Sequence, residues 1–269
     1  MASLTDNELI EKARAGDAKA MEQLLARHEQ RVYRFGLRMC GNEEDARDVL
    51  QETLLAAFKN LATFRGDSQI STWLYQVARS FCIKQRRRRE GEPQHHEAIE
   101  GTEVKKLAAD VSEPDSRTHA RQVGQVIQAA MNTLQDDYRE ALVLRDVEGL
   151  SAEEAAGVVG IEVGALKSRL HRARMQLKQS LSAVLQEETT DIGCPELQQE
   201  LTAYAASEID QAACARIEQH LEKCPKCTAA CEALKRTVSM CRAIPGGDVP
   251  APVKAAVRQA LRASQVPGF

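Results

Sequence analysis

The chain has 269 residues, a formal net charge of −3 at pH 7 and only 4% aromatic residues. This length allows more than one domain, and so few aromatic side chains disfavour a large β-sandwich. A chain this close to neutrality is no polycation, so any nucleic-acid surface must come from local clusters of basic residues. No stretch approaches the roughly 20 apolar residues of a membrane span, and residues 1–20 contain no apolar signal-peptide core. We therefore expect a cytoplasmic protein without membrane contact.

Helical periodicity runs through the first block, residues 1–92, and no strand pattern occurs anywhere, which predicts an all-α fold. Gly16 interrupts the first helical stretch, and Asn42 is placed to cap the next helix, whose first turn is acidic. Apolar side chains recur along that helix at helical spacing: Ala46, Val49, Leu50, Thr53, Leu54, Ala57 and Phe58. The opposite face carries Asp48, Gln51, Glu52 and Leu55.

A loop around residues 60–68 leads into an amphipathic helix that ends in a basic run. The run includes Lys84, Arg86, Arg87 and Arg88. Such a run binds backbone phosphates through a salt-sensitive term that ignores base sequence, but it also suits any acidic partner. We expect Trp73 in the core. Residues 93–117 combine few apolar side chains with frequent Pro, Gly and charge, which predicts a flexible linker.

The second block, residues 118–187, divides into three predicted helices. Gly149 can end the first, Ser151 and Glu154 fit a capping box that opens the second, and Gly160 supplies a tight turn before the third. A short helix, a glycine turn and a longer helix form a helix-turn-helix.

The third helix of this block is basic, with Lys167, Arg169, Arg172, Arg174 and Lys178. Helical spacing puts Lys167, Ser168, His171 and Arg172 on one face, opposite a predicted buried stripe of Leu166, Leu170, Ala173 and Leu177. A recognition helix needs such a polar face to reach phosphates and base edges. A solvated basic helix packed on a core is the alternative interpretation.

The chain has eight cysteines, of which Cys40 and Cys82 are expected in the core and six lie between residues 194 and 241. Cytosolic thiols are normally reduced, so this cluster indicates a metal or redox module, residues 190–243. His220 and Cys224 are four residues apart on one helix face, and Cys227 completes a Cys-x2-Cys spacing that suits tetrahedral zinc. A closed site needs a fourth ligand.

Cys214, Cys231 and Cys241 are surplus to a four-ligand site. Extra soft thiolates suit sensing of Cu(I), Cd(II) or Zn(II) or oxidation that ejects the metal, whereas small buried core residues are the alternative. The remaining segment, residues 244–269, is predicted as a linker and an amphipathic helix over residues 252–263. This helix either packs against another domain or completes its own module.

The sequence GALKSRLHRAR resembles region 4 of extracytoplasmic-function (ECF) sigma factors, with Ala165 and Leu166 in place of the family's Thr and Val. Region 4 of that family binds the promoter −35 element. By position, the resemblance implies contacts from Lys167, Ser168, Arg169, His171 and Arg172.

DARDVLQETLLAAF resembles sigma region 2, whose helix docks on the clamp helices of the polymerase β′ subunit. The implied polymerase-binding residues are Asp48, Gln51, Glu52 and Leu55. The following segment, FRGDSQISTWLYQVARSFCIKQRRRR, resembles the family's −10 region, in which a loop captures a flipped base of the non-template strand. The implied −10 and backbone contacts are Asn60, Phe64, Arg65, Lys84, Arg86, Arg87 and Arg88.

The stretch from Cys194 to Cys227 resembles the zinc-binding domain of anti-sigma factors, in which an early Cys or His joins a His-x3-Cys-x2-Cys motif. The implied ligands are Cys194, His220, Cys224 and Cys227. The sequence therefore predicts a sigma factor fused to what is normally a separate inhibitor, and some sigma factors with cysteine-rich C-terminal domains respond to copper, cadmium or zinc.

These resemblances imply a non-enzymatic subunit that binds core RNA polymerase, through the β′ clamp helices and the β flap, and promoter DNA. Contact of the C-terminal module with regions 2 and 4 is expected. One alternative is a metal- or thiol-responsive helix-turn-helix regulator that never joins polymerase. A thiol oxidoreductase using Cys224 and Cys227 is disfavoured, because the βαβ context of such sites is missing from the predicted elements.

Overall fold

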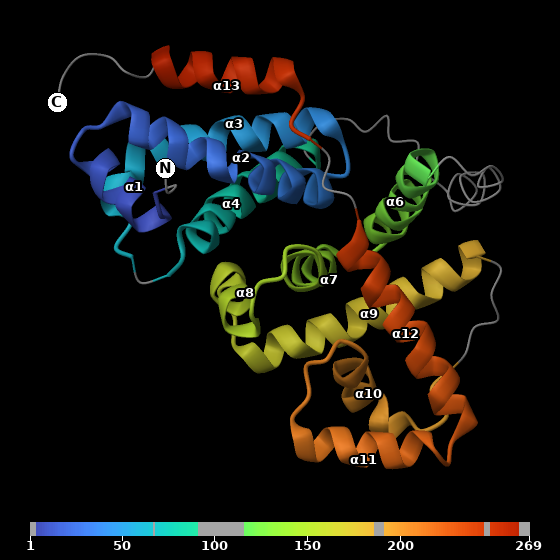
Figure 1. Ribbon diagram of the computed structural model, residues 1–269. Coiled ribbons are helices and arrows are strands. Elements are labelled where there is room, and N and C mark those ends of the chain that lie inside the picture. The colour runs from blue at the N-terminus through green and yellow to red at the C-terminus, as the bar shows by residue number, and fades with distance from the viewer. Residues whose placement is uncertain (1–3, 67, 91–115, 186–190, 245–247, 264–269) are drawn as a thin grey trace. The chain divides into compact units, whose positions relative to one another are not determined.

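The computed structural model describes residues 4–66, 68–90, 116–185, 191–244 and 248–263, and every regular element in these ranges is a helix (Figure 1). The all-α prediction is thereby confirmed. Almost all of the predicted linker at 93–117 lies outside the described residues. No described helix has an apolar stretch long enough to span a bilayer.

The residues fall into two compact units, 1–95 with 246–269 and 96–245. The helices of the first unit are α1 (Asp6–Arg14), α2 (Ala18–Cys40), α3 (Glu43–Asn60), η1 (Leu61–Thr63), α4 (Ile70–Glu90) and α13 (Ala251–Ala263). The chain reverses between α2 and α3 at Gly41, whose φ of 77° is left-handed. The Asn42 side chain then accepts a 2.9 Å hydrogen bond from the Asp45 backbone N–H, as the predicted cap requires.

The core of the first unit lies where α2, α3 and α4 pack together. Leu50, Leu54 and Leu74 are fully buried, and the rings of Phe35 and Tyr75 lie 5.3 Å apart. The predicted apolar stripe of α3 is buried except for Phe58, which is half-buried. Helix positions with the predicted spacing therefore do form this core.

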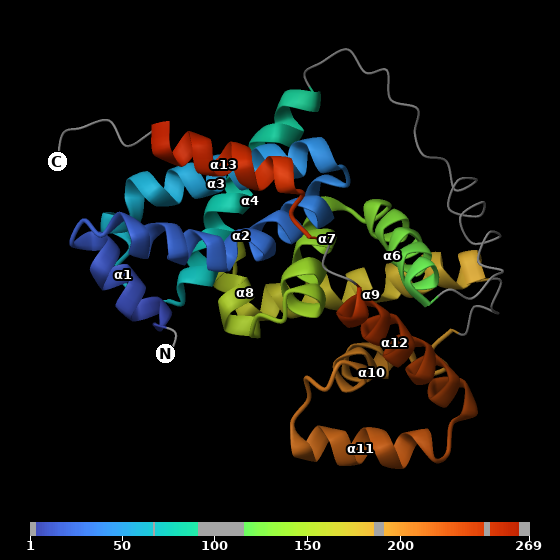
Figure 2. The same ribbon diagram turned by 45° about the horizontal axis from the view of Figure 1, so that its top comes forward.

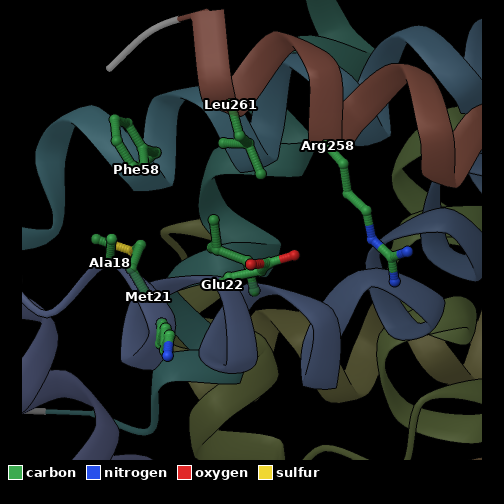
Figure 3. Close-up of a pocket in the computed structure, with 8 residues that line it drawn as sticks. Ala18, Met21, Glu22, Phe58, Arg258 and Leu261 are labelled. Carbon is green, nitrogen blue, oxygen red and sulfur yellow. The ribbon is translucent and has the colours of Figure 1, made fainter. Parts of the chain in front are cut away.

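Helix α13 lies along α3 in both views (Figures 1 and 2). Val253 and Val257 are buried, and Lys254 forms a 3.3 Å ion pair with Glu29 of α2. Figure 3 shows Arg258 and Leu261 of α13 at a cavity of about 170 Å³ that α2 and α3 also line. Of the two alternatives for this helix, the structure shows packing against the first block.

The second unit holds the helix-turn-helix and the cysteine-rich module. Its helices are α6 (Ser116–Asn132), α7 (Asp136–Leu142), η2 (Val143–Val147), α8 (Ala152–Val159), α9 (Val163–Leu185), η3 (Pro195–Leu197), α10 (Gln198–Ala205), α11 (Gln211–Leu221) and α12 (Pro225–Ala243). Ser151 and Glu154 form the predicted capping box of α8, and Gly160 ends that helix with a φ of 78°.

The predicted stripe of α9 is buried at Leu166, Leu170, Ala173 and Leu177. Arg174 and Lys178, two of the five basic residues named on this helix, are also buried. Helices α10 and α12 pack against α9, so the predicted C-terminal module, described from residue 191 onward, forms one compact unit with the helix-turn-helix.

Candidate metal centre and nucleic-acid interface

Three segments of the module bring the four predicted metal ligands together. Cys194 precedes η3, His220 lies in the last turn of α11, Cys224 is the N-cap of α12, and Cys227 lies in the first turn of α12. One ligand atom from each of these residues lies within 4.8 Å of all the others. A Cβ atom at Gly193 would meet Cys224 Sγ at 3.6 Å, so the glycine lets the Cys194 loop approach α12 closely. This is the compact arrangement that a four-ligand metal site needs.

The chemistry of the four groups fits a soft divalent cation. His220 Nε2 is buried and has no hydrogen-bond partner among the described residues, a state that costs about 1–3 kcal/mol and that a metal bond would relieve. Burial, with the neighbouring Cys227 and Cys224, raises the pKa of Cys194 to about 11. Hydrogen bonds from Cys227, its backbone N–H first, lower the pKa of Cys224. A cation would stabilise all three as thiolates.

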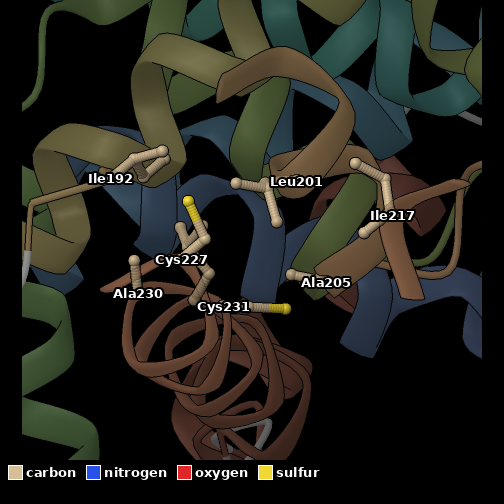
Figure 4. Packing of buried hydrophobic residues seen from close by; sticks show 8 residues of the cluster. Ile192, Leu201, Ala205, Ile217, Cys227, Ala230 and Cys231 are labelled. Carbon is tan, nitrogen blue, oxygen red and sulfur yellow. The ribbon is translucent and has the colours of Figure 1, made fainter. Parts of the chain in front are cut away.

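The three surplus cysteines lie outside the ligand cluster. Cys231 and Cys241 are buried, and Figure 4 shows Cys231 in the module's apolar core with its sulfur pointing in a different direction from that of Cys227. Burial raises the pKa of Cys231. Cys214 is half-buried, and its thiol donates to Glu218 Oε1 at 3.5 Å. These positions favour the core interpretation for Cys231 and Cys241.

A buried ion network joins the module to the helix-turn-helix. Arg174 of α9 is 2% exposed and donates two hydrogen bonds to Asp146, at 2.7 and 2.8 Å. It also donates to Glu208 Oε2 of the module at 2.8 Å, and Arg145 pairs with the same carboxylate. Burial acts to raise the pKa of Glu208, but the hydrogen bond and charge of Arg174 outweigh it and lower this pKa. The network therefore holds the module against α9 through charges withdrawn from water.

A second polar contact lies on the predicted DNA-reading face. His171 Nδ1 and Thr202 Oγ1 of α10 are 2.9 Å apart, and burial with the charges of Arg172 and Arg174 lowers the pKa of His171. Lys167 and Ser168 line a cavity of about 570 Å³ whose other wall is formed by α10 and α11. The carboxylates of that wall belong to Glu200, Glu208 and Asp210. Ser168 and His171 of the predicted −35 face thus face the module and are half-buried, whereas Lys167 stays exposed.

The other predicted −35 contacts have partners within the helix-turn-helix. Arg169 forms a 2.9 Å ion pair with Asp137, and the exposed Arg172 donates to the Tyr138 hydroxyl at 3.2 Å. The Ser168 hydroxyl donates to the Gly164 carbonyl at 3.1 Å. The structure therefore brings the predicted residues together on α9, and Arg172 remains accessible.

The predicted polymerase-binding face lies on the surface of α3, partly opposite α4. Asp48, Gln51 and Glu52 are exposed and Leu55 is half-buried. These four residues are called the docking face below. The first three line a cavity of about 440 Å³ whose opposite wall is α4, and Gln85 of α4 donates to Asp48 at 3.2 Å.

The predicted −10 residues divide between surface and core. Asn60 and Arg65 are exposed, and so are Lys84, Arg87 and Arg88 of the basic run on α4, whereas Arg86 is half-buried. Phe64 is buried, and its ring packs against Trp73 with centroids 5.5 Å apart. In this conformation Phe64 packs in the core under the loop around residues 60–68, and its ring is not accessible to a DNA base.

Sequence reasoning missed Asp146, Arg174 and Glu208 as a linked group. A signal was present for Arg174, which follows Leu170 by four residues and precedes Leu177 by three, and so lies on the apolar stripe of α9. A charge on such a stripe indicates a buried partner. Nothing local could identify that partner as Glu208, 34 residues further along.

Comparison with known proteins gives three family matches: Sigma-70 region 2 over residues 24–92, Sigma-70 region 4 over 124–177 and a zinc-finger family over 194–228. The ECF RNA polymerase sigma-E factor of Haemophilus influenzae is 30% identical over 186 residues, covering 68% of this chain and 98% of that protein. The ECF RNA polymerase sigma factor SigE of Mycolicibacterium smegmatis is 32% identical over 175 residues, covering 62% of this chain and 65% of that protein.

Among solved structures, this chain is similar to the sigma factor RpoE in complex with the anti-sigma factor NepR from Bartonella quintana. The identity is 26%, the TM-score is 0.47, and the match covers 61% of this chain and 98% of that one.

Removing the metal should unfold the module while leaving the first unit folded. We expect Cys227→Ser, or treatment with a chelator, to lower the melting temperature of the second unit, because structural zinc contributes folding free energy directly. The matched control is Cys241→Ser, which changes another buried cysteine of α12 outside the ligand cluster. Equal metal content in both variants, measured by elemental analysis, would count against the assigned ligands.

Replacing Glu208 with Gln should destabilise the second unit by about 1–3 kcal/mol, because Arg174 then loses a charged acceptor in a buried site. Since the folded-state pKa of Glu208 is lowered, its contribution is present above the unfolded pKa and is lost as pH falls through the folded value. The difference in melting temperature between wild type and variant should therefore shrink below about pH 4.

The control for this prediction is Glu200→Gln, which removes a carboxylate whose 3.5 Å ion pair with Arg216 is solvent-exposed. Exposed pairs contribute at most about 1 kcal/mol. Calorimetry that gives the same loss for both variants would mean that the Glu208 contact contributes no more than a surface pair.

Proposed function

This chain belongs to the extracytoplasmic-function sigma factors of RNA polymerase, and we propose that it joins the core enzyme in the cytoplasm and directs it to promoters. It catalyses no reaction of its own in this role. The observation that carries the proposal is the pairing, in one chain, of an exposed acidic docking face on α3 with a helix-turn-helix whose second helix is basic.

The docking face is the surface for the polymerase β′ clamp helices. Asp48 and Glu52 are one helical turn apart on α3, so their carboxylates act together on a basic partner. Gln51 adds hydrogen bonds, and Leu55 supplies an apolar anchor that is half-buried. Charge of this kind steers association and fixes orientation. Region 4 adds the second attachment, to the β flap.

Promoter DNA is read at two places. Lys167, Ser168, Arg169, His171 and Arg172 are the proposed −35 contacts. Arg172 is exposed on α9, and a bidentate contact to guanine would be worth about 1–3 kcal/mol of discrimination. The loop that carries Asn60 and Arg65 reads the −10 element, and Lys84, Arg86, Arg87 and Arg88 hold phosphates. Phe64 contributes by supporting this loop.

The module is the proposed regulatory part, and Zn²⁺ is its proposed resident metal. Three thiolates and one imidazole are a common donor set for structural zinc, although the same soft ligands also suit Cu or Cd. Bound metal stabilises the fold of the module and so keeps the module packed against α9. With α10 packed against α9, a DNA duplex cannot reach the half-buried Ser168 and His171, because the cavity beside them has about 570 Å³, the size of a small ligand. The state in which the module is packed against α9 is therefore the one that does not bind the −35 element.

A helix-turn-helix regulator that never joins polymerase is the second candidate. Such a protein needs no acidic surface on α3, so the docking face distinguishes the two. We expect the double variant Asp48→Asn, Glu52→Gln to bind purified core polymerase at least about tenfold more weakly than wild type, since two interfacial charges are lost.

The matched control is Glu11→Gln with Glu44→Gln, which removes two exposed carboxylates of the first unit outside the docking face. Binding is measured by fluorescence anisotropy on full-length proteins with matched circular dichroism spectra. If both double variants bind alike, the docking face lies elsewhere; if the wild type does not bind polymerase with or without metal, the sigma-factor role is rejected.

A further inference from the structure

Two cysteines of the first unit lie in contact, although 42 residues separate them in the sequence. Cys40 is the last residue of α2, and Cys82 lies in the middle of α4. Their Sγ atoms are 3.8 Å apart, and both stand as thiols. Neither belongs to the metal centre, whose ligands all come from the other unit.

The positions of the two thiols are suitable for a disulfide. A disulfide needs an S–S distance of about 2.05 Å, so the sulfur atoms must approach by less than about 2 Å, within reach of side-chain rotation and a small backbone shift. Cys40 can make such a shift because it ends its helix and is followed by Gly41 in the left-handed region. A buried cysteine in mid-helix, such as Cys82, has less freedom to move.

The two thiols also differ in access to solvent. Cys82 is 2% exposed, whereas Cys40 is half-buried. A small oxidant therefore reacts with Cys40 first. Cys82 lies in contact with Cys40 and can then react with the oxidised Cys40 sulfur. This arrangement of an accessible thiol beside a second one is typical of reversible thiol oxidation.

We propose that Cys40 and Cys82 form a reversible disulfide when the protein meets a peroxide. The Cys40 thiolate attacks one oxygen of hydrogen peroxide and breaks the O–O bond, which gives a sulfenic acid and a hydroxide that takes up the thiol's proton as water. The Cys82 sulfur then attacks the sulfenic sulfur, and the hydroxyl leaves with the Cys82 proton as a second water. Two thiols lose two electrons, and one peroxide is reduced to two waters.

The Cys40–Cys82 disulfide would close a loop that contains the proposed functional residues of the first unit. Residues 41–81 contain all of α3 with its docking face and the loop around Asn60. A cross-link over such a segment restricts the unfolded chain and ties the end of α2 to α4. The first unit thereby acquires its own response to oxidants, independent of the metal-binding module.

The test uses the full-length reduced protein. It is treated with hydrogen peroxide, alkylated and digested with trypsin, and the peptides are identified by mass spectrometry. We expect residues 39–47 linked to residues 80–84, a linkage that dithiothreitol removes. Calorimetry should show the transition of the first unit raised by about 5 °C or more in the oxidised protein.

Three variants make the result specific. Cys40→Ser and Cys82→Ser should each abolish the linked peptide, and Cys82→Ser should leave a sulfenic acid on Cys40 that dimedone traps. Cys241→Ser, which changes a buried cysteine of the other unit, should leave the linkage intact. Peroxide treatment that yields Cys40 sulfinic acid, or Cys40 linked only to cysteines of the module, would overturn the proposal.

Discussion

The buried charge of Arg174 is the constraint on which the second unit depends. Withdrawing a guanidinium from water costs several kcal/mol unless carboxylates compensate it. Asp146 provides one from within the helix-turn-helix, and Glu208 provides the other from the module. If the module leaves α9, Arg174 keeps Asp146, but both it and Arg145 lose Glu208. Contact of the module with α9, the proposed recognition helix, and the electrostatics of that helix are therefore coupled through Arg174.

The metal centre is connected to this contact through shared packing. Cys227 is both a proposed metal ligand and a member of the module's apolar core, where it lies with Leu201 and Cys231 (Figure 4). Met175 of α9 packs against the same core. Loss of the ion would loosen the core that holds α10 beside α9, and so would weaken the His171–Thr202 contact. A change at the proposed ligands can thus reach the proposed DNA-reading face of α9 without any contact between metal and DNA.

Local chemistry allowed much of this structure to be predicted from the sequence. Asn42, Ser151 and Gly160 mark helix ends because their own side chains or φ angles make the caps. The predicted ligands His220, Cys224 and Cys227 are close in sequence, so their spacing alone indicates that they lie together. Cys194 could be predicted as a ligand only from the resemblance to known proteins. Tertiary packing alone determines the burial of Arg174 and its pairing with Glu208. It also determines the position of α13 along α3 and the approach of Cys40 to Cys82. Helical periodicity reports which face is buried, but it does not identify the partner that buries it.

The claim that the module covers the −35 face of α9 is tested most directly by DNA affinity. The full-length, metal-loaded chain and a chain ending at residue 186 are compared for binding to a −35 duplex selected with the shorter chain, at one fixed salt concentration. The account predicts that the shorter chain binds the duplex at least about tenfold more tightly, since loss of the contacts between the module and α9 frees the proposed recognition helix. Equal affinities for the two chains would contradict it.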